Sequence, residues 1–302
     1  GTFAEALDRA LAVANGDWVM PLYPGDRLAR HALLRLVEAI DESPAAALVY
    51  ADSDSLGSDG ERLEPCFKPD WNPDLLLAQN YIGRAVLYRA DRLRAAGGFG
   101  RYGGAACGYD TLLRFTDGLG APEIVHLPHI LYHQRQPGSA DHEDEALASR
   151  ESRLVVEDHL GGRQPAAKVH ETAVAGVQRV EWPLPEPEPL VSVLVPTRDR
   201  LDVLRPCVEA VLHDTEYRNL ELIVIDNRSR RADTQAFLRG LPARDARVRV
   251  LHWNHPFNFS ALNNFAAGQA EGDLLAFLNN DVVPLQRGWL RELVSQACRD
   301  GI

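Results

Sequence analysis

Three apolar segments in the C-terminal part of the chain, residues 190–195, 220–225 and 274–278, run directly into polar side chains. The residues that follow them are, in chain order, Pro196, Thr197, Arg198 and Asp199, then Asp226, Asn227, Arg228 and Ser229, then Asn279, Asn280 and Asp281. Ligands of open parallel sheets bind beyond the carboxyl ends of the strands. If the three segments are buried neighbouring strands, these polar residues share one crevice.

Two carboxylates of this set suggest specific chemistry. The Asp226 carboxylate can accept a hydrogen bond from the ring N–H of uracil or thymine. Asp281, next to asparagine amide oxygens, offers the hard oxygen ligands that suit Mg²⁺ or Mn²⁺ held partly by substrate phosphates. Each ending taken alone is equally compatible with a turn, because Asn and Asp tolerate left-handed conformations. Three such endings on consecutive segments favour a binding site.

The segments between these residues predict the scaffold that positions them. Helical spacing over residues 201–212, 257–273 and 288–300 alternates with the apolar runs. Continuous apolar runs are expected for strands that helices cover on both faces. The pattern is typical of an α/β fold with a mostly parallel sheet and flanking helices.

The first 135 residues alternate helix and strand signals in the same way, so we expect a mostly parallel sheet there too. The following segment differs, since it reads as a charged helix, a small hairpin and the proline-rich stretch "PLPEPEPL", which resembles a stiff spacer. The predicted division is residues 1–137, a linker segment at 138–185, and residues 186–302.

Composition excludes several classes of protein. The chain is 45% hydrophobic and 25% charged, as soluble globular proteins are. Its net charge of −11 argues against a nucleic-acid partner, since phosphate binding requires a basic surface. The four cysteines are far apart, which favours neither zinc nor disulfides and indicates a reducing, cytoplasmic compartment. No apolar run approaches the ~20 residues of a membrane span, and no signal peptide is visible.

An internal repeat links the two ends of the chain. Gly16-Asp17 and Gly272-Asp273 each follow a helical pattern and open an apolar run, so a helix–strand–helix unit occurs twice. A circularly permuted single domain would contain the unit once. Two copies therefore favour a fragment of a tandem array, with one partial domain at each end.

Several spaced motifs resemble the family-2 inverting glycosyltransferases of the GT-A fold, in particular the multidomain bacterial enzymes of O-antigen and rhamnan-type polysaccharide assembly. "VSVLVPTRDR", "LELIVIDNRS" and "FNFSALNNFAAGQAEGDLLAFLNND" resemble the nucleotide-sugar-binding half of that fold. "FKPDWNPDLLLAQNYIGRAVLYRADRLRAAGGF", "YDTLLRFTD" and "IVHLPHILYHQR" resemble the acceptor-side half. The resemblance implies the acceptor-side half of a first domain at 1–137 and the donor-binding half of a second at 186–302.

The resemblance also assigns roles by position. Thr197 and Asp199 would line the nucleoside pocket, Asp226 would contact the base, and Asn263 would lie near the diphosphate. Asn279-Asn280-Asp281 matches the Asp-x-Asp position of the family, so Asp281 would bind Mg²⁺ or Mn²⁺, which neutralises charge on the leaving diphosphate. The full predicted nucleotide-sugar set is Pro196, Thr197, Asp199, Asp226, Asn227, Asn263 and Asn279.

The first domain departs from the family pattern at two positions. Tyr23-Pro24-Gly25 stand where the Asp-x-Asp motif is expected, and Asp26 comes one residue too late. Gly108 occupies the place of the catalytic base, which leaves Asp110 as the candidate acid in that domain. The two losses predict a degenerate first domain. The base of the second domain is expected beyond Ile302.

An acidic stretch in the first domain resembles a calcium loop. It contains Asp52, Asp54 and Asp59, but Leu56 and Leu63 stand where an EF-hand needs oxygen ligands. We therefore predict a polar turn without a bound ion.

Three histidines, His126, His129 and His133, lie on a predicted strand. Strand alternation places His129 and His133 on one face and His126 on the other. No acidic or cysteine partner has a spacing that suits zinc, so a structural or acceptor-lining role is favoured. Four tryptophans could either stack on sugars or pack at domain surfaces: Trp71, Trp182, Trp253 and Trp289.

Together these features predict a metal-assisted glycosyltransferase. It would transfer a sugar with inversion from a nucleotide diphosphate-sugar to a glycan or lipid-linked glycan of a growing bacterial surface polysaccharide. The predicted location is cytoplasmic, compatible with peripheral association with assembly machinery at the inner face of the plasma membrane. The alternative is a non-catalytic glycan-binding or scaffolding module built from degenerate domains. A nucleotidyltransferase is disfavoured, because "PTRDRLD" lacks the glycines of a triphosphate loop.

Overall fold

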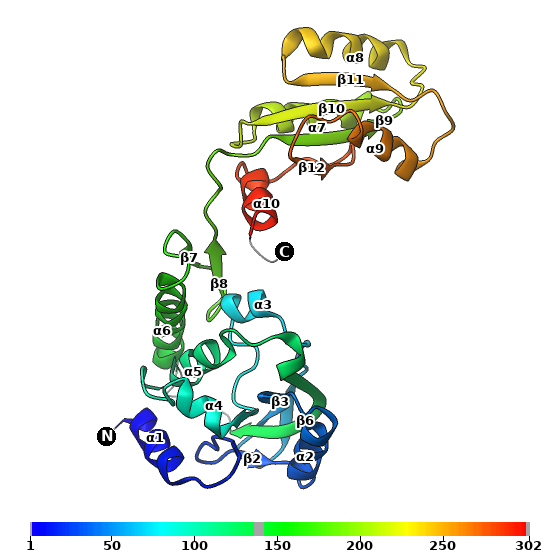
Figure 1. Cartoon of the computed structure of the whole chain (residues 1–302). Helices are drawn as coiled ribbons and strands as arrows, with labels where there is room; N and C mark the ends of the chain where they lie inside the picture. The colour runs from blue at the N-terminus through cyan, green and yellow to red at the C-terminus, as the bar shows by residue number, and fades with distance from the viewer. Residues whose placement is uncertain (1, 105, 136–141, 300–302) are drawn as a thin grey trace. The chain divides into compact units, whose positions relative to one another are not determined.

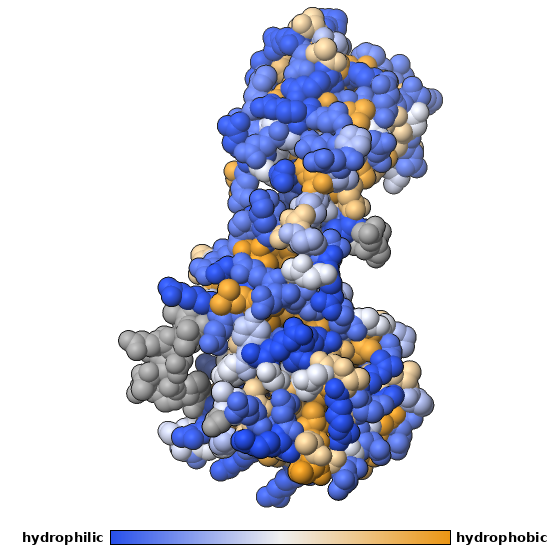
Figure 2. All heavy atoms as spheres, turned by 60° about the vertical axis from the view of Figure 1, so that its left-hand side comes forward, coloured by the Kyte–Doolittle hydropathy of each residue, from blue (hydrophilic) through white to orange (hydrophobic). Residues whose placement is uncertain are grey.

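The computed structural model describes residues 2–104, 106–135 and 142–299. The chain divides into two compact units, Gly1–Glu181 and Trp182–Ile302, each of which is described by itself (Figure 1). The face drawn in Figure 2 is mostly hydrophilic, with apolar side chains in scattered patches. Within the part of the chain that the structure describes, no helix is long and apolar enough to cross a membrane.

Unit 1 is built around a six-stranded sheet with the strand order β1-β5-β3-β6-β2, in which β4 pairs with β3. Its elements in chain order are α1 (Phe3–Val13), β1 (Trp18–Val19), β2 (Arg27–Leu28), α2 (Ala32–Glu42), β3 (Leu48–Leu56), β4 (Arg62–Cys66), α3 (Pro73–Ala78), β5 (Val86–Arg89), α4 (Ala90–Ala95), α5 (Ala106–Thr116), a 3-10 turn (Ala121–Glu123), β6 (Ile124–Arg135), α6 (His142–Gly161), β7 (Lys168–Glu171) and β8 (Gln178–Glu181).

The sheet of unit 1 is mixed, which corrects the prediction of a mostly parallel sheet for this part of the chain. Among the strand pairs described for this sheet, β3 and β6 are parallel. The other four pairs, β1–β5, β3–β5, β2–β6 and β3–β4, are antiparallel. The physical reason is the length of the connections. A short turn at residues 57–61 joins β3 to β4, and such a turn can only reverse the chain, whereas a parallel pair needs a long crossover.

Side-chain hydrogen bonds fix both the start of α1 and the last part of unit 1. The Thr2 hydroxyl accepts a hydrogen bond from the Glu5 backbone N–H, and the Glu5 carboxylate accepts one from the Thr2 N–H, so a capping box begins α1. The helix and the hairpin predicted for the segment 138–185 form α6 and the pair β7–β8. They pack within unit 1, where the Gln178 side-chain amide donates to Tyr109 Oη at 2.8 Å.

Unit 2 has a four-stranded sheet with the order β11-β10-β9-β12, and every pair is parallel. Helices separate the strands, and a core of Val, Leu and Phe side chains packs between helices and sheet, so the predicted α/β architecture is confirmed here. The elements are β9 (Val191–Thr197), α7 (Leu201–His213), β10 (Leu220–Asp226), α8 (Ala232–Arg244), β11 (Val248–His252), α9 (Phe259–Ala267), β12 (Leu274–Phe277) and α10 (Trp289–Ala297).

The last strand differs from its neighbours in burial. Residues of β9 and β10 are buried almost throughout, as the continuous apolar runs predict. In contrast, β12 lies at the edge of the described sheet, and its Leu275 and Phe277 side chains are exposed. The expectation of a fully buried third strand is therefore wrong. An apolar run alone does not say whether a strand has a neighbour on both sides.

Candidate functional site

The parallel register of unit 2 aligns the strand ends at one edge of the sheet. Asp226, the last residue of β10, is the register partner of Thr197 on β9 and of His252 on β11. On the far side of Thr197, the Asn280 side-chain amide donates to the Thr197 hydroxyl at 3.0 Å. The polar residues predicted to share a crevice are thus brought into one row, and His252 extends that row.

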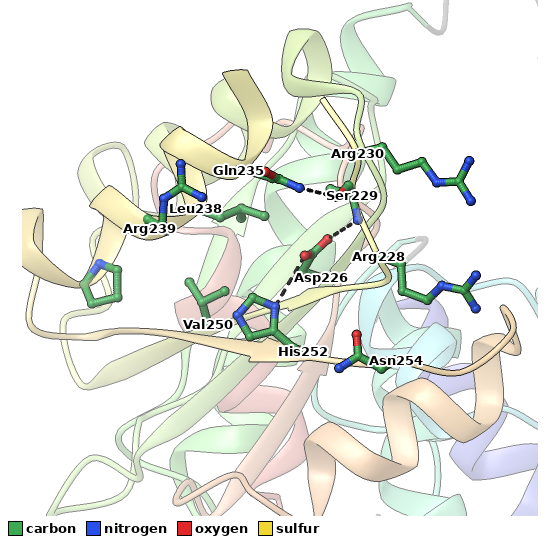
Figure 3. A pocket seen from close by; sticks show the side chains of 11 residues that line it. Asp226, Arg228, Ser229, Arg230, Gln235, Leu238, Arg239, Val250, His252 and Asn254 are labelled. Atoms are coloured by element: carbon green, nitrogen blue, oxygen red, sulfur yellow. Dashed lines mark hydrogen bonds and ion pairs between the residues drawn. The ribbon is translucent and has the colours of Figure 1, made fainter. Parts of the chain in front are cut away.

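Asp226 is nearly buried, with 7% of its surface exposed. One carboxylate oxygen accepts a hydrogen bond from the Ser229 backbone N–H at 2.9 Å, and the other lies 3.4 Å from Nδ1 of His252. Both side chains line a cavity of about 600 Å³ between α8 and β11, with Leu238 and Val250 among its apolar walls (Figure 3). An acceptor at the mouth of a partly apolar cavity suits a heteroaromatic ring that carries an N–H.

Asp199 uses its carboxylate within the fold. It has a left-handed backbone (φ 54°), and one carboxylate oxygen accepts the backbone N–H groups of Arg230 and Arg231, both at 2.8 Å. The hydrogen bond from Arg231 is the main cause that lowers the pKa of the Asp199 carboxyl. Asp199 therefore ties the loop after β9 to the loop after β10, and its place at the crevice serves to fix both loops.

Two asparagines of the predicted site, Asn227 and Asn263, have a buried side-chain amide oxygen without a hydrogen-bond partner among the described residues. Asn227, 2% exposed, donates from its amide to the carbonyls of Trp253 and His255, which anchors the loop after β11. Asn263, 4% exposed, donates to the Phe259 carbonyl on α9. Neither Oδ1 atom has a hydrogen-bond partner in the described structure. Buried polar atoms are almost always satisfied, so these two acceptors are compatible with a ligand or water in the crevice.

The Asn-Asn-Asp motif follows β12 at the same edge. Asn279 and Asn280 line a second cavity of about 240 Å³ together with Pro196, Thr197 and Asn227. The Asn279 carbonyl accepts a contact from the buried Cys207 thiol at 3.6 Å, and burial raises the pKa of that thiol to about 11.

Asp281 is exposed and forms no hydrogen bond or ion pair with any residue that the structure describes. Among the described residues, no group of three or more His, Cys, Asp or Glu side chains is arranged to hold a metal ion. A dedicated metal cage is therefore absent from that part of the chain. One free carboxylate does fit Mg²⁺, because this ion keeps several waters and binds through one or two carboxylates plus substrate phosphates. The residues fit a metal that arrives with a diphosphate.

Sequence reasoning missed three residues at this edge. His252 was hidden because it ends an alternating strand whose pairing could not be read from the sequence. Phe257 and Phe259, 64% and 48% exposed, line the smaller cavity beside the asparagines. No signal in the sequence marks Phe257 and Phe259 as exposed, and only the fold shows it; large aromatic side chains outside a core often mark contact surfaces.

Residues 192–302 match the sequence model described as "Glycosyl transferase family 2". Two longer proteins are each 38% identical over nearly the whole chain, namely the "Uncharacterized protein y4gI" of Sinorhizobium fredii and the "O-antigen biosynthesis protein RfbC" of Myxococcus xanthus. The two alignments include 100% and 99% of this chain, but only 34% and 23% of the length of the relatives.

One similar solved structure is a mannosyltransferase, PcManGT from Pyrobaculum calidifontis, in complex with GDP-Man and Mn²⁺. It aligns with 54% of this chain and 45% of its own at 18% identity, with a TM-score of 0.36. The family 2 match covers the segment that carries the whole row of strand-end residues.

In unit 1, Tyr23 of the Tyr-Pro-Gly stretch lies beside Gly108. A Cβ atom added to Gly108 would lie 3.4 Å from the Tyr23 hydroxyl. Asp110 is buried and pairs with Arg114 at 2.8 Å, and that guanidinium also binds backbone carbonyls of residues 96 and 98. The candidate acid of this unit is thus engaged in the fold, and a tyrosine hydroxyl borders the position expected for the base.

The acidic stretch of unit 1 is divided between a strand and a turn, so the predicted polar turn is confirmed only for the part after Leu56. Asp52 and Asp54 are buried in β3, and only residues after Leu56 form the turn. The His126 Nε2 atom lies 3.0 Å from the Asp52 carboxylate, and the His133 Nδ1 atom lies 2.5 Å from the Asp54 carboxylate. Acidic partners for these histidines therefore exist, but they come from a neighbouring strand that sequence spacing does not reveal.

The predicted faces of the histidines are also wrong. β6 has register shifts where it passes Ala51 and Asp52 of β3, and these break the strict two-residue alternation. As a result His126 and His133 both reach aspartates of β3. His129 is exposed, and its Nε2 atom lies 2.9 Å from the Arg35 guanidinium.

Three of the four tryptophans pack within unit 2. The Arg299 guanidinium lies 4.2 Å from the ring centre of Trp182, and Trp253 contacts the ring of Phe265. The Trp289 indole N–H donates to the Thr215 hydroxyl at 3.0 Å. These contacts favour the packing interpretation. Trp71 instead lines a cavity of about 260 Å³ in unit 1.

Proposed function

We propose that unit 2 is the nucleotide-sugar-binding half of a family 2 glycosyltransferase domain of the GT-A fold. The observation that carries the proposal is the free Asp281 carboxylate at the end of the row formed by His252, Asp226, Thr197 and Asn280, within the segment that matches the family. Such a row offers acceptors for a nucleobase at one end and a metal ligand for the diphosphate at the other.

In this proposal each strand-end residue has a separate task. Asp226 accepts a hydrogen bond from the base, while Thr197 and Pro196 border the nucleoside. Asn227, Asn263 and Asn279 surround the sugar-phosphate part. Mg²⁺ or Mn²⁺ held by Asp281 would neutralise the charge that develops on the leaving diphosphate.

The parent reaction proposed is transfer, with inversion, of the sugar to a glycan or lipid-linked glycan during assembly of a bacterial surface polysaccharide. The 38% identity to an O-antigen biosynthesis protein supports this acceptor class. Unit 1 is proposed to be the acceptor-side half of a degenerate domain, because Gly25 and Gly108 stand where acids are expected and Asp110 is paired with Arg114. The buried acid–histidine pairs of unit 1 favour a structural role, which keeps a non-catalytic scaffolding function for that unit as the second candidate.

The decisive experiment is titration of the full chain with UDP, dTDP and GDP by calorimetry, with and without Mn²⁺. We expect Mn²⁺-dependent binding that weakens at least about tenfold in Asp281→Ala, since a charge-assisted contact contributes about 1.5–3 kcal/mol. Asp214→Ala is the matched control, because Asp214 is an exposed aspartate at the C-terminal end of α7, away from the strand ends. Equal Mn²⁺ dependence in the wild type and in Asp281→Ala would show that the metal assignment is wrong.

A further inference from the structure

The cavity of about 260 Å³ that Trp71 lines is formed by residues of unit 1, where α3, α5 and α6 meet (Figure 1). From α5 it takes Leu113 and Thr116, which lie toward the C-terminal end of that helix. Gly108, at the position expected for the base, lies near the other end of the same helix. A rise of about 1.5 Å per residue separates it from Thr116 by roughly 12 Å along the helix axis. The cavity therefore does not include the altered motif position.

Trp71 forms part of the cavity wall, and both of its neighbours in the chain are anchored. An Asp70 carboxylate oxygen lies 3.0 Å from Nδ1 of His126, and the Asn72 backbone N–H donates to Tyr81 Oη at 3.0 Å. The Asn72 side chain also caps the first turn of α3. The half-buried indole of Trp71 has no hydrogen-bonding partner among the residues that the structure describes. Trp71 thus contributes a fixed apolar ring and an N–H donor without a partner.

α6 contributes the imidazole of His159 to the lining. Burial lowers the pKa of this ring, and the Arg163 guanidinium lowers it further, so the imidazole is neutral at pH 7. The Nδ1 atom is buried, and neither ring nitrogen has a hydrogen-bond partner among the described residues. In either tautomer the less buried Nε2 atom can donate or accept one hydrogen bond. A histidine in this state at a cavity wall is compatible with a ligand that supplies the missing hydrogen bond.

An ion pair borders the same cavity. The Arg163 guanidinium binds the Asp117 carboxylate through two nitrogens, with Nε at 3.0 Å from Oδ1, and it also donates to the His159 carbonyl at 3.0 Å. These contacts join the end of α5 to α6 and fix the carboxylate. Both side chains of the pair are 43% exposed. Because a carboxylate has about four lone-pair positions, Asp117 keeps acceptor positions for a further donor.

We propose that this cavity binds one pyranose ring of a carbohydrate, with a C–H face of the ring against Trp71 and hydroxyl groups hydrogen-bonded to His159 and Asp117. A pyranose has C–H groups on its faces and hydroxyl groups around its edge, which matches a lining that is apolar on Leu113 and Trp71 and polar on α6. The volume is slightly below the about 300–1,000 Å³ of drug-sized sites, so it suits a single ring. A purely apolar ligand would leave the imidazole and the carboxylate without partners, which is unfavourable.

This inference goes beyond the proposed nucleotide site, because every residue that carries it belongs to unit 1. It gives that unit a carbohydrate-binding role that does not require its altered motif positions. The unit would then hold part of a glycan without acting on it chemically.

The test is saturation-transfer difference NMR of the full chain with the methyl pyranosides of mannose, glucose and rhamnose at millimolar concentrations. We expect the wild type to transfer saturation to at least one pyranoside, most strongly to the C–H protons of one ring face. Two probes each lack half of the proposed contacts, since sorbitol has hydroxyl groups but no ring and cyclohexanol has a ring with one hydroxyl. Each should bind at least about fivefold more weakly than that pyranoside.

Substitutions in the cavity should change pyranoside binding in a graded way. Trp71→Ala should weaken it at least about fivefold, and Trp71→Phe, which keeps an aromatic ring, should retain part of it. His159→Phe keeps a ring of similar shape, removes both nitrogens and should weaken binding several-fold. Phe67→Ala is the matched control, because Phe67 is an aromatic residue of the same segment that is 72% exposed and does not line the cavity.

The possible results separate this inference from the proposed function. It is wrong if no pyranoside binds the wild type, if cyclohexanol binds more tightly than every pyranoside, or if Trp71→Ala and His159→Phe bind as the wild type does. Asp281→Ala should bind the pyranoside normally, and the Trp71 variants should keep Mn²⁺-dependent nucleotide binding, so either proposal can fail while the other stands. Thermal unfolding of each variant shows whether the fold is retained, and Trp71→Phe and His159→Phe decide the matter if Trp71→Ala does not fold.

Discussion

Gly272 allows the strand that carries the Asn-Asn-Asp motif to approach its neighbour closely. A Cβ atom at this position would lie 2.6 Å from both the backbone nitrogen and the hydroxyl of Ser192, and 2.7 Å from the Leu190 carbonyl. The Gly272 N–H also donates to the Ser192 hydroxyl at 2.8 Å. Two of the three obstructing atoms belong to the backbone of the β9 region, so they cannot rotate away. Replacement by alanine must therefore move β12 relative to β9.

The cost of Gly272→Ala can be worked from these contacts. Overpacking of one methyl group against a fixed backbone costs about 1–3 kcal/mol, and loss of the hydrogen bond to Ser192 adds about 1 kcal/mol. The expected loss of unfolding free energy is about 2–4 kcal/mol, which corresponds to a lowering of the Tm by roughly 8–16 °C for a unit of this size. Gly240→Ala is the matched control. Its added Cβ meets only the Arg244 side chain at 3.9 Å, inside α8, so the change should stabilise by about 0.5–1 kcal/mol.

Hydrogen exchange measured by mass spectrometry, combined with urea unfolding of the full chain, locates the effect. Peptides from β9 and β12 should lose protection in Gly272→Ala, while peptides from unit 1 keep it. The loop that carries Asp281 should follow β12, so Mn²⁺-dependent nucleotide binding should weaken in the same variant. A Tm within about 2 °C of the wild type, together with unchanged protection of β12, would refute the close-approach argument, because a few degrees correspond to less than about 1 kcal/mol.

Two further predictions concern unit 1. Burial lowers the pKa of Lys68 to about 8 from 10.5, so between these values the unfolded chain holds a proton that the folded chain lacks, and the contribution of Lys68 to the unfolding free energy rises with pH. Urea unfolding at pH 7.5 and 9.5 should therefore show a more positive change of the unfolding free energy with pH in the wild type than in Lys68→Met, and equal pH slopes would contradict this. Asp26→Asn should lower the unfolding free energy by about 2–4 kcal/mol, because the buried carboxylate accepts from Tyr132 Oη at 2.7 Å, Arg135 N at 2.9 Å and Arg84 at 3.2 Å. The measurement is urea unfolding of the variant, and an unchanged midpoint would show that these contacts contribute little.

The strands of unit 2 could be predicted because the residues of each strand are themselves enough to indicate it. β9 and β10 are buried on both faces, so each reads as an unbroken apolar run, and the first polar residue marks the carboxyl end. The place of His252 next to Asp226 was not predictable in the same way. It depends on which residue of β11 stands opposite Asp226, and register is a property of the assembled sheet.

The sheet of unit 1 could not be predicted in this way, because its strands depend on side chains that are distant in the sequence. Asp52 and Asp54 disfavour a strand by their own propensity, so the sequence does not show how far the strand continues. In the fold their carboxylates are satisfied by His126, His133 and Arg62, from partners 8 to 79 residues away in the chain. Tertiary partners override local propensity at these positions, and no local pattern contains that information.

The contrast between the two units lies in what their carboxylates bind. In unit 1, Asp26 follows the altered Tyr-Pro-Gly motif and is buried among three donors, so it has no exposed oxygen to offer to an ion. In unit 2, Asp199 is likewise held by backbone N–H groups, but Asp281 is exposed and has no hydrogen-bonding partner among the described residues. A carboxylate can act on a ligand only if the fold leaves it free. By that physical criterion, the Asp281 carboxylate is accessible to a ligand, and Asp26 stabilises the fold.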